Sequence, residues 1–181
     1  MRCVQRFIGA IGLAAVALAG AGCGATMPPS FAENPLAPSG SPEQPDTKPL
    51  PDIKRRTLDG ATFETAALRG KKIVVVKFFA KYCAPCKESL PWFERFAKQH
   101  PNVAVIGIAE DERESDAREV VSAYGLTFPV VHDTGNALSG RFRVSDMPIT
   151  FVADRRGRIR WVGGPGQTEA QLEAAVSASS R

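Results

Sequence analysis

A seven-residue apolar run that leads into two closely spaced cysteines is the feature that most restricts how this chain can fold. Residues 73–79 (Ile-Val-Val-Val-Lys-Phe-Phe) are mostly β-branched or aromatic, which predicts a strand covered on both faces in the middle of a sheet. Cys83 and Cys86 follow, and residues 87–100 have the apolar spacing of a helix. The chain is therefore expected to hold a cysteine pair between a central strand and a helix.

Strand and helix patterns alternate along the rest of residues 52–181, which predicts an α/β domain built on a mixed sheet. The other expected elements are a hairpin at 53–63, a helical turn at 65–68, a strand at 103–108, a helix at 110–124, a strand at 128–131, a short helix at 137–142, paired strands at 149–152 and 159–162, and a final helix capped by Thr168.

The first residues have the layout of an export signal. Arg2 and Arg6 precede an uncharged apolar stretch at 7–19, and small residues then lead to Cys23. This stretch is short for a bilayer span, so a cleaved signal is favoured over a permanent transmembrane helix. Residues 24–51 are crowded with Pro, Ser, Gly and Ala, which predicts an extended tether. The expected organisation is a signal peptide at 1–23, a Pro-rich disordered tether at 24–51 and a folded domain at 52–181.

Residues 18–23 (Leu-Ala-Gly-Ala-Gly-Cys) resemble the lipobox of bacterial lipoproteins, in which the cysteine becomes the lipidated first residue of the mature protein. The match is imperfect, because Gly20 stands where lipoboxes usually have leucine. An ordinary cleavage site that happens to lie near Cys23 is the alternative. The resemblance implies lipidation of Cys23 and attachment of the domain to a membrane.

The composition fits one globular domain. The chain has 181 residues, of which 44% are hydrophobic, enough for one ordinary core. Its formal net charge of +4 comes from scattered basic residues, without a dense basic block or interleaved aromatic residues. We expect no nucleic-acid partner.

The cysteine count indicates redox chemistry. Cys3 leaves with the signal and Cys23 carries lipid in this scheme, so Cys83 and Cys86 are the thiols of the folded domain. A disulfide between them closes too short a loop to remove much unfolded-state entropy. Its value must therefore lie in thiol–disulfide exchange.

The position of Cys83 favours a reactive thiolate. It precedes a helix that begins near Pro85, where the helix dipole and unpaired backbone N–H groups stabilise an anion. Cys86 lies one turn further in and is expected to be the buried resolving thiol. Half of a zinc site is the alternative, but His100 and His132 are the only histidines and no second cysteine pair accompanies them. We expect no metal and no cofactor.

Three segments carry a resemblance to the thioredoxin superfamily. They are residues 78–87 (Phe-Phe-Ala-Lys-Tyr-Cys-Ala-Pro-Cys-Lys), Pro91, and residues 147–151 (Met-Pro-Ile-Thr-Phe). The tether, the early hairpin and residues 128–133 look most like the TlpA/ResA group of extracytoplasmic proteins. The resemblance implies a thioredoxin-like fold, in which helices flank a central mixed β-sheet, with an N-terminal β-hairpin extension.

The same resemblance implies roles for individual residues. Cys83 and Cys86 form the redox-active disulfide, and Pro148 is a cis proline that lies against them. The backbone of Met147 pairs with an extended substrate peptide. The remaining substrate-binding residues that it implies flank the cysteines: Tyr82, Ala84 and Pro85.

Two positions depart from the family pattern and leave the proton acceptor open. Lys77 stands where thioredoxins often bury an acid, and Ser89 stands where ResA-like proteins commonly have glutamate, with Glu88 one residue earlier. Lys77 is either an amine of lowered pKa, a partner of Glu88 or Glu110, or a lysine that reaches outward to solvent. Lys77 and Glu88 are therefore the candidate acceptors.

The resemblance favours reduction of disulfides in exported proteins, such as apocytochrome c, on the periplasmic side of a membrane. A membrane thiol donor of the DsbD or CcdA type would re-reduce the dithiol. One alternative is an oxidant of exported thiols. Another is a copper-handling or purely binding module that keeps the fold but not the turnover. His132 is similar in position to the distal ligand of Sco-like copper proteins, but those proteins have a wider cysteine spacing, which favours an ordinary strand-end histidine.

Overall fold

The structure is a computed structural model and describes residues 48–180. The predicted signal peptide, Cys23 and most of the predicted tether lie outside the described residues. Within the described part, no helix combines the length and the apolar character needed to cross a membrane.

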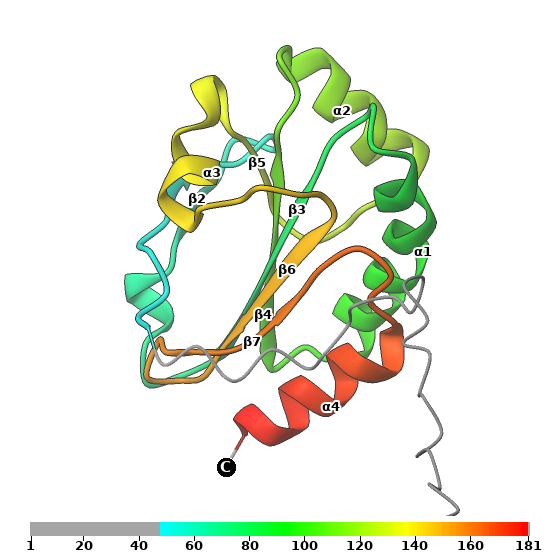
Figure 1. Ribbon diagram of the computed structural model, residues 1–181. Helices are drawn as coiled ribbons and strands as arrows, with labels where there is room; N and C mark the ends of the chain where they lie inside the picture. Colours follow the sequence, from blue (N-terminus) through cyan, green and yellow to red (C-terminus); the bar gives the residue numbers. More distant parts are fainter. Residues whose placement is uncertain (1–47, 181) are drawn as a thin grey trace, which may run out of the picture. The chain divides into compact units, whose positions relative to one another are not determined.

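A five-stranded mixed sheet forms the centre of the described domain, in the order β5-β4-β3-β6-β7 (Figure 1). The central strand β3 pairs in parallel with β4 and antiparallel with β6. The outer strand β5 runs parallel to β4, and β7 runs antiparallel to β6. The strands are β3 (Ile73–Phe79), β4 (Val103–Ala109), β5 (Val130–His132), β6 (Ile149–Ala153) and β7 (Ile159–Gly163).

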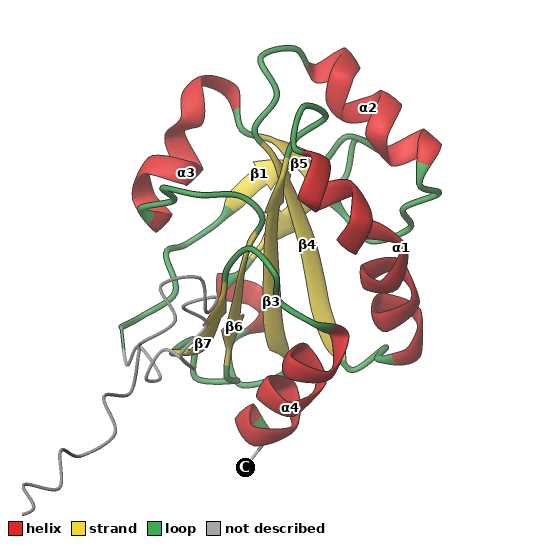
Figure 2. Ribbon diagram, turned by 45° about the vertical axis from the view of Figure 1, so that its right-hand side comes forward, coloured by secondary structure: helices red, strands yellow, loops and turns green. Residues whose placement is uncertain are grey.

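Helices cover both faces of this sheet, as Figure 2 shows. On one face α1 (Ala84–Gln99), α2 (Glu114–Ala123) and α4 (Glu169–Ser179) contribute to one apolar core. The opposite face is covered by α3 and the N-terminal segments, which share a second core. These elements are β1 (Lys54–Arg56), β2 (Thr62–Glu64), η1 (Ala66–Leu68), η2 (Thr134–Asn136) and α3 (Ala137–Phe142). The thioredoxin-like fold and the N-terminal hairpin, in which β1 pairs antiparallel with β2, are confirmed.

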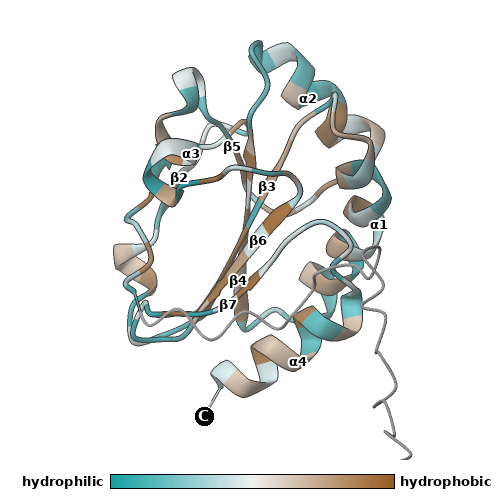
Figure 3. Cartoon of the chain, viewed as in Figure 1, coloured by the Kyte–Doolittle hydropathy of each residue, from teal (hydrophilic) through white to brown (hydrophobic). Residues whose placement is uncertain are grey.

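The two cores explain why β3 lacks the alternation of apolar and polar residues that is typical of a strand with one face in solvent. Alternate side chains of a strand point to opposite faces, and Val75 and Phe79 join the core under α1 while Val76 and Phe78 join the other. Figure 3 shows apolar residues along the central strands. Lys77 interrupts this pattern and, by its position, points to the α1 face.

The folded domain begins before the predicted boundary at Asp52. Leu50 is buried, and its backbone N–H donates a 2.8 Å hydrogen bond to the carbonyl of Gly157. The N–H of Ile159 donates to the carbonyl of Lys48. Residues 48–51, which the sequence pattern places in the tether, are therefore part of the domain.

Helix α2 begins at Glu114, later than the predicted start at 110. The preceding residues bind to the end of β3 instead: the N–H of Glu110 donates to the carbonyl of Phe79 over 2.9 Å, and Asp111 accepts from a nearby backbone N–H. The predicted cap at Thr168 is confirmed as a full capping box with Gln171.

Candidate active site

Cys83 and Cys86 form a disulfide at the junction of β3 and α1. Cys83 is the N-cap residue of α1, and its sulfur accepts a hydrogen bond of 3.2 Å from the backbone N–H of Cys86. Pro85 occupies the first turn, where a missing N–H costs nothing. The positive end of the helix dipole and an oriented N–H therefore both favour a thiolate on Cys83.

The two sulfurs differ in access. Cys83 keeps 7% of its surface exposed, whereas Cys86 is fully buried in the core under α1. Cys83 also lines an open groove, and Cys86 does not. This asymmetry fits an attacking thiol that meets a substrate and a resolving thiol that meets only Cys83.

The groove beside Cys83 has a volume of about 600 Å³. One wall is the cysteine loop, and the facing wall is the segment that leads into β6. Exposed Tyr82 stands on the rim. The groove is lined by Tyr82, Cys83, Ala84, Pro85, Glu110, Val144, Ser145, Asp146 and Met147. The structure thus brings together all four of the predicted substrate-binding residues.

The peptide bond between Met147 and Pro148 is cis, as predicted. Met147 lines the groove, and Pro148 is buried next to it in the chain. The segment before β6 therefore faces the cysteine loop across the groove.

The two candidate proton acceptors lie in very different surroundings. Glu88 is exposed on α1 and is absent from the groove lining. Lys77 is fully buried, and its Nζ lies 4.5 Å from the ring centre of Phe93 on α1. Within residues 48–180 this Nζ has no hydrogen-bond partner, and burial lowers the pKa of Lys77 to about 7. The interpretation of Lys77 as a lysine that reaches outward is wrong, because its position in β3 directs it into the core.

Glu110 is a groove residue that sequence reasoning did not place there. It directly follows β4, at the same edge of the sheet as the cysteines, because β3 and β4 are parallel. The pKa of Glu110 is raised, chiefly by burial, and the nearby charge of Asp133 acts in the same direction. The sequence does contain a signal for an acidic residue at this edge of the sheet, because three consecutive acidic residues at 110–112 directly follow a buried strand.

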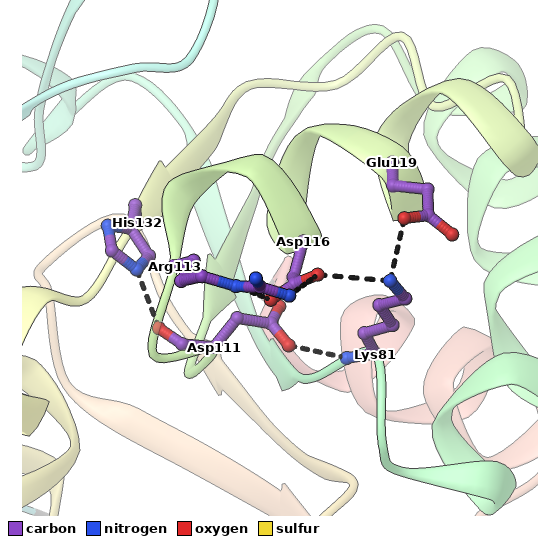
Figure 4. Close-up of polar contacts among 6 residues, drawn as sticks. All are labelled: Lys81, Asp111, Arg113, Asp116, Glu119 and His132. Carbon is purple, nitrogen blue, oxygen red and sulfur yellow. Dashed lines mark hydrogen bonds and ion pairs between the residues drawn. The ribbon is translucent and has the colours of Figure 1, made fainter.

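A network of polar contacts ties the loop before the cysteines to α2 (Figure 4). The backbone N–H of Lys81 donates to Oδ1 of Asp111 over 2.8 Å. The side-chain Nζ of Lys81 forms ion pairs with Asp116 at 3.0 Å and Glu119 at 2.6 Å. The ring Nε2 of His132 is hydrogen-bonded to the backbone carbonyl of Asp111 over 2.6 Å. The strand-end histidine thus supports the loop that carries Asp111.

Known proteins are similar to this chain in sequence. The pattern of the AhpC/TSA family matches residues 47–162. The thiol-disulfide oxidoreductase ResA of Bacillus anthracis is 30% identical over 128 residues, which cover 70% of this chain and 73% of that protein. The thioredoxin-like protein YneN of Bacillus subtilis is 28% identical over 127 residues, covering 68% of this chain and 74% of its own.

Solved structures show the same fold. A secreted disulfide oxidoreductase of Mycobacterium tuberculosis, homologous to Escherichia coli DsbE, superimposes with a TM-score of 0.64 at 27% identity, covering 70% of this chain and 95% of that one. A thioredoxin-family thiol:disulfide interchange protein of Chlorobium tepidum gives a TM-score of 0.67 at 26% identity, covering 74% and 96%. This chain therefore belongs to the AhpC/TSA family of the thioredoxin superfamily and is a ResA-like thiol–disulfide oxidoreductase.

Proposed function

We propose that this protein reduces disulfides of exported proteins, with Cys83 as the attacking thiol and Cys86 as the resolving thiol. The Cys83 thiolate attacks one sulfur of the substrate disulfide, a mixed disulfide forms, and the first substrate thiolate leaves. The Cys86 thiolate then attacks the Cys83 sulfur, and the second substrate thiolate leaves. The enzyme is left with the intramolecular disulfide that the structure contains.

The observation that carries this proposal is the difference in access between the two sulfurs at the start of α1. Cys83 combines groove exposure with stabilisation of its thiolate, while Cys86 is fully buried. The groove gives an extended peptide room between Tyr82 and Met147. We infer that Tyr82, Ala84, Pro85 and Met147 contact the substrate, and that Pro148 shapes the wall against which it lies.

Trapping tests the assignment of the two thiols. Cys86→Ser lacks the resolving thiol, so the reduced variant should accumulate a mixed disulfide with a thiol-exchangeable protein substrate. Cys83→Ser, the matched control, should trap little, because the sulfur that remains is buried. Non-reducing electrophoresis separates and detects the mixed disulfides. Equal trapping by the two variants would overturn the assignment.

The direction of electron flow is tested by the equilibrium reduction potential of the Cys83/Cys86 couple. A value near that of thioredoxin, about −270 mV, supports a reductase that needs a membrane donor of the DsbD or CcdA type. A value near −120 mV would indicate an oxidant of exported thiols and overturn the proposed direction. Substrates in cytochrome c biogenesis, such as apocytochrome c, are the class that the ResA resemblance favours.

We also propose that the protein acts on the periplasmic side of a membrane, tethered by lipid on Cys23. The M. tuberculosis relative is described as secreted, which agrees with export. Metabolic labelling with a fatty-acid analogue should mark the wild-type protein and leave Cys23→Ser unmarked. Labelling that persists in Cys23→Ser would refute the anchor.

A further inference from the structure

The end of the sheet opposite the cysteines carries two basic segments. β3 and β6 are antiparallel, with Val74 in register with Ala153, so the start of β3 and the end of β6 lie at the same end of the sheet (Figure 1). Residues 69–72 (Arg-Gly-Lys-Lys) lead into β3, and residues 155–158 (Arg-Arg-Gly-Arg) lie in the turn from β6 to β7. The cysteine loop follows the far end of β3, a strand about 20 Å long.

Contacts between the two basic segments hold them side by side. The backbone N–H of Gly70 donates a 2.6 Å hydrogen bond to the carbonyl of Arg155. A Cβ atom at Gly157 would lie 3.4 Å from Nε of Arg69, so this side chain lies against the turn. The two segments therefore form one surface, which we call the basic end. Its cations are Arg69, Lys71, Lys72, Arg155 and Arg156.

Most of this positive charge is not neutralised by carboxylates. The side chains of Lys71, Lys72 and Arg155 donate to backbone carbonyls over 3.2, 3.0 and 3.1 Å. A carbonyl is neutral, so these three side chains keep their net charge. Arg69 differs, because it forms an ion pair with Asp52 at 2.7 Å.

A second carboxylate at this end is held inside the turn. Asp154 is buried, accepts hydrogen bonds from the backbone N–H groups of Arg156 and Arg158 at 2.9 Å, and pairs with Arg160 at 2.7 Å. The side chains of Arg155 and Arg156 are exposed. The basic end thus presents an excess of positive charge to solvent.

The preceding chain enters the domain at this same end. The N–H of Ile159 donates a 3.0 Å hydrogen bond to the carbonyl of Lys48, and Pro49 forms a β-bridge with Arg158. A lipid anchor on Cys23 therefore connects to the domain at its basic end. The anchor keeps a membrane surface within reach of these cations, which raises the effective concentration of lipid headgroups.

The cysteine end has the opposite charge. Glu110 and Asp146 line the groove beside Cys83, and Asp111 and Glu112 directly follow Glu110. An anionic surface attracts the basic end and repels the cysteine end. This distribution of charge favours one orientation, with the basic end toward the surface.

We propose that the basic end docks on anionic phospholipid headgroups of the membrane and holds the groove beside Cys83 away from the bilayer. This goes beyond the proposed thiol chemistry and rests on the proposed anchor. Lysine and arginine donate charge-assisted hydrogen bonds to phosphate oxygens, and arginine can do so with two parallel bonds. Each such cation near an anionic membrane strengthens binding by about fivefold.

The experiment measures sedimentation of the full chain with vesicles. The chain carries Cys23→Ser, so that no lipid on the protein contributes to binding. Vesicles of phosphatidylcholine with about one-third phosphatidylglycerol should bind the chain more tightly than vesicles of phosphatidylcholine alone. This preference should weaken from about 0.01 M to about 0.1 M salt, because the Debye length falls from about 30 Å to about 10 Å. The apolar stretch at 7–19 is present in every sample and cancels in the comparison.

Two variants with the same change in net charge separate the basic end from the rest of the surface. One removes three exposed cations of the basic end: Lys71→Gln, Arg155→Gln and Arg156→Gln. The control removes three exposed cations of α1, α2 and α3: Arg95→Gln, Arg118→Gln and Arg141→Gln. The first should lower the affinity for the anionic vesicles by at least about tenfold, and the control should retain most of it. Both should reduce insulin at the parent rate, because none of the six residues lines the groove.

Several results would overturn the proposal. Equal losses in the two variants would show that net charge alone explains binding, and equal binding to both kinds of vesicle would exclude the headgroup charge. A surface that serves an acidic protein would bind immobilised poly-glutamate and leave the vesicles unbound. Alkylation of reduced Cys83 should proceed at one rate with and without anionic vesicles, and protection would contradict the orientation. Labelling of Cys23 and trapping by Cys86→Ser are scored separately, so failure here leaves the anchor and the thiol chemistry standing.

Discussion

The backbone N–H of Lys81 donates a 2.8 Å hydrogen bond to Oδ1 of Asp111, which ties the loop before Cys83 to the segment between β4 and α2. Asp111→Ala should leave this N–H without its partner and cost about 1–3 kcal/mol of unfolding free energy. Insulin reduction should slow, because the loop that positions Cys83 loses an anchor. Asp111→Asn keeps an acceptor oxygen and should retain most of the stability and most of the rate of insulin reduction. Equal losses in urea unfolding for the two variants would contradict the hydrogen-bond explanation.

The same carboxyl predicts a pH dependence. Burial raises the pKa of Asp111, with the backbone bond from Lys81 acting in the opposite direction. A raised folded-state pKa means that the fold favours the protonated form, so this contribution is full below the ordinary aspartate pKa and is lost as pH rises through the raised value. The stability of Asp111→Asn relative to wild type should therefore increase from acid to neutral pH. Urea unfolding at a series of pH values from acid to neutral measures this difference in stability. A difference that does not change with pH would contradict the prediction.

Lys77 predicts the opposite slope at alkaline pH. Its pKa falls from 10.5 to about 7 on burial, so the unfolded chain binds a proton between these values that the folded protein does not. The stability of oxidised wild type should rise with pH across this range, and Lys77→Met should flatten the rise. At pH 7 the methionine variant should be more stable by roughly 3–5 kcal/mol. Equal alkaline slopes in urea unfolding would show that Lys77 is solvated.

The elements that carry the site follow from local patterns in the sequence. The mostly apolar run at 73–79 predicts the bounds of β3, and the cysteine spacing with Pro85 predicts the start of α1. The sequence pattern predicts a helix at 110–113 where the structure has a loop, because helical spacing and charge cannot show that Asp111 accepts a hydrogen bond from a backbone N–H 30 residues earlier. The sequence also does not show that Lys77 is buried without an ion pair. This depends on which side chains of other elements lie next to Lys77 in the folded domain.

Glu94 is a buried carboxylate that joins α1 to the segment before β5. It accepts hydrogen bonds from the backbone N–H of Thr127 at 2.8 Å and from its hydroxyl at 2.6 Å. Burial raises the pKa of Glu94, but these bonds and Lys98 outweigh it and leave the pKa lowered. Glu94→Ala should lower the free energy of unfolding by about 2 kcal/mol near neutral pH. The contribution of Glu94 in the wild-type protein should be lost as pH falls through its lowered pKa, because the carboxylate is then protonated.

A matched control for Glu94 lies on the same helix. Gln99→Ala replaces an exposed residue of α1 and should change the unfolding free energy by less than about 0.5 kcal/mol. Glu94→Gln should fall between the two, because an amide can accept from only one of the two Thr127 donors. Thermal or urea unfolding of the oxidised proteins checks the order. A loss at Glu94→Ala no larger than that at Gln99→Ala would contradict the role of this carboxylate.

Gly163 and Gly164 are adjacent but differ in what a methyl group would meet. A Cβ at Gly163 would lie 2.0 Å from the Trp161 ring, whereas at Gly164 no atom lies within 4 Å. Gly163→Ala should therefore cost about 1–3 kcal/mol through overpacking and displace Gln167, while Gly164→Ala should be close to neutral. Urea unfolding of the oxidised proteins measures the difference in stability between the two variants. If Gly163→Ala were as stable as Gly164→Ala, the Trp161 and Gln167 side chains would have to move away from position 163 at little cost, which would contradict the close packing around this glycine.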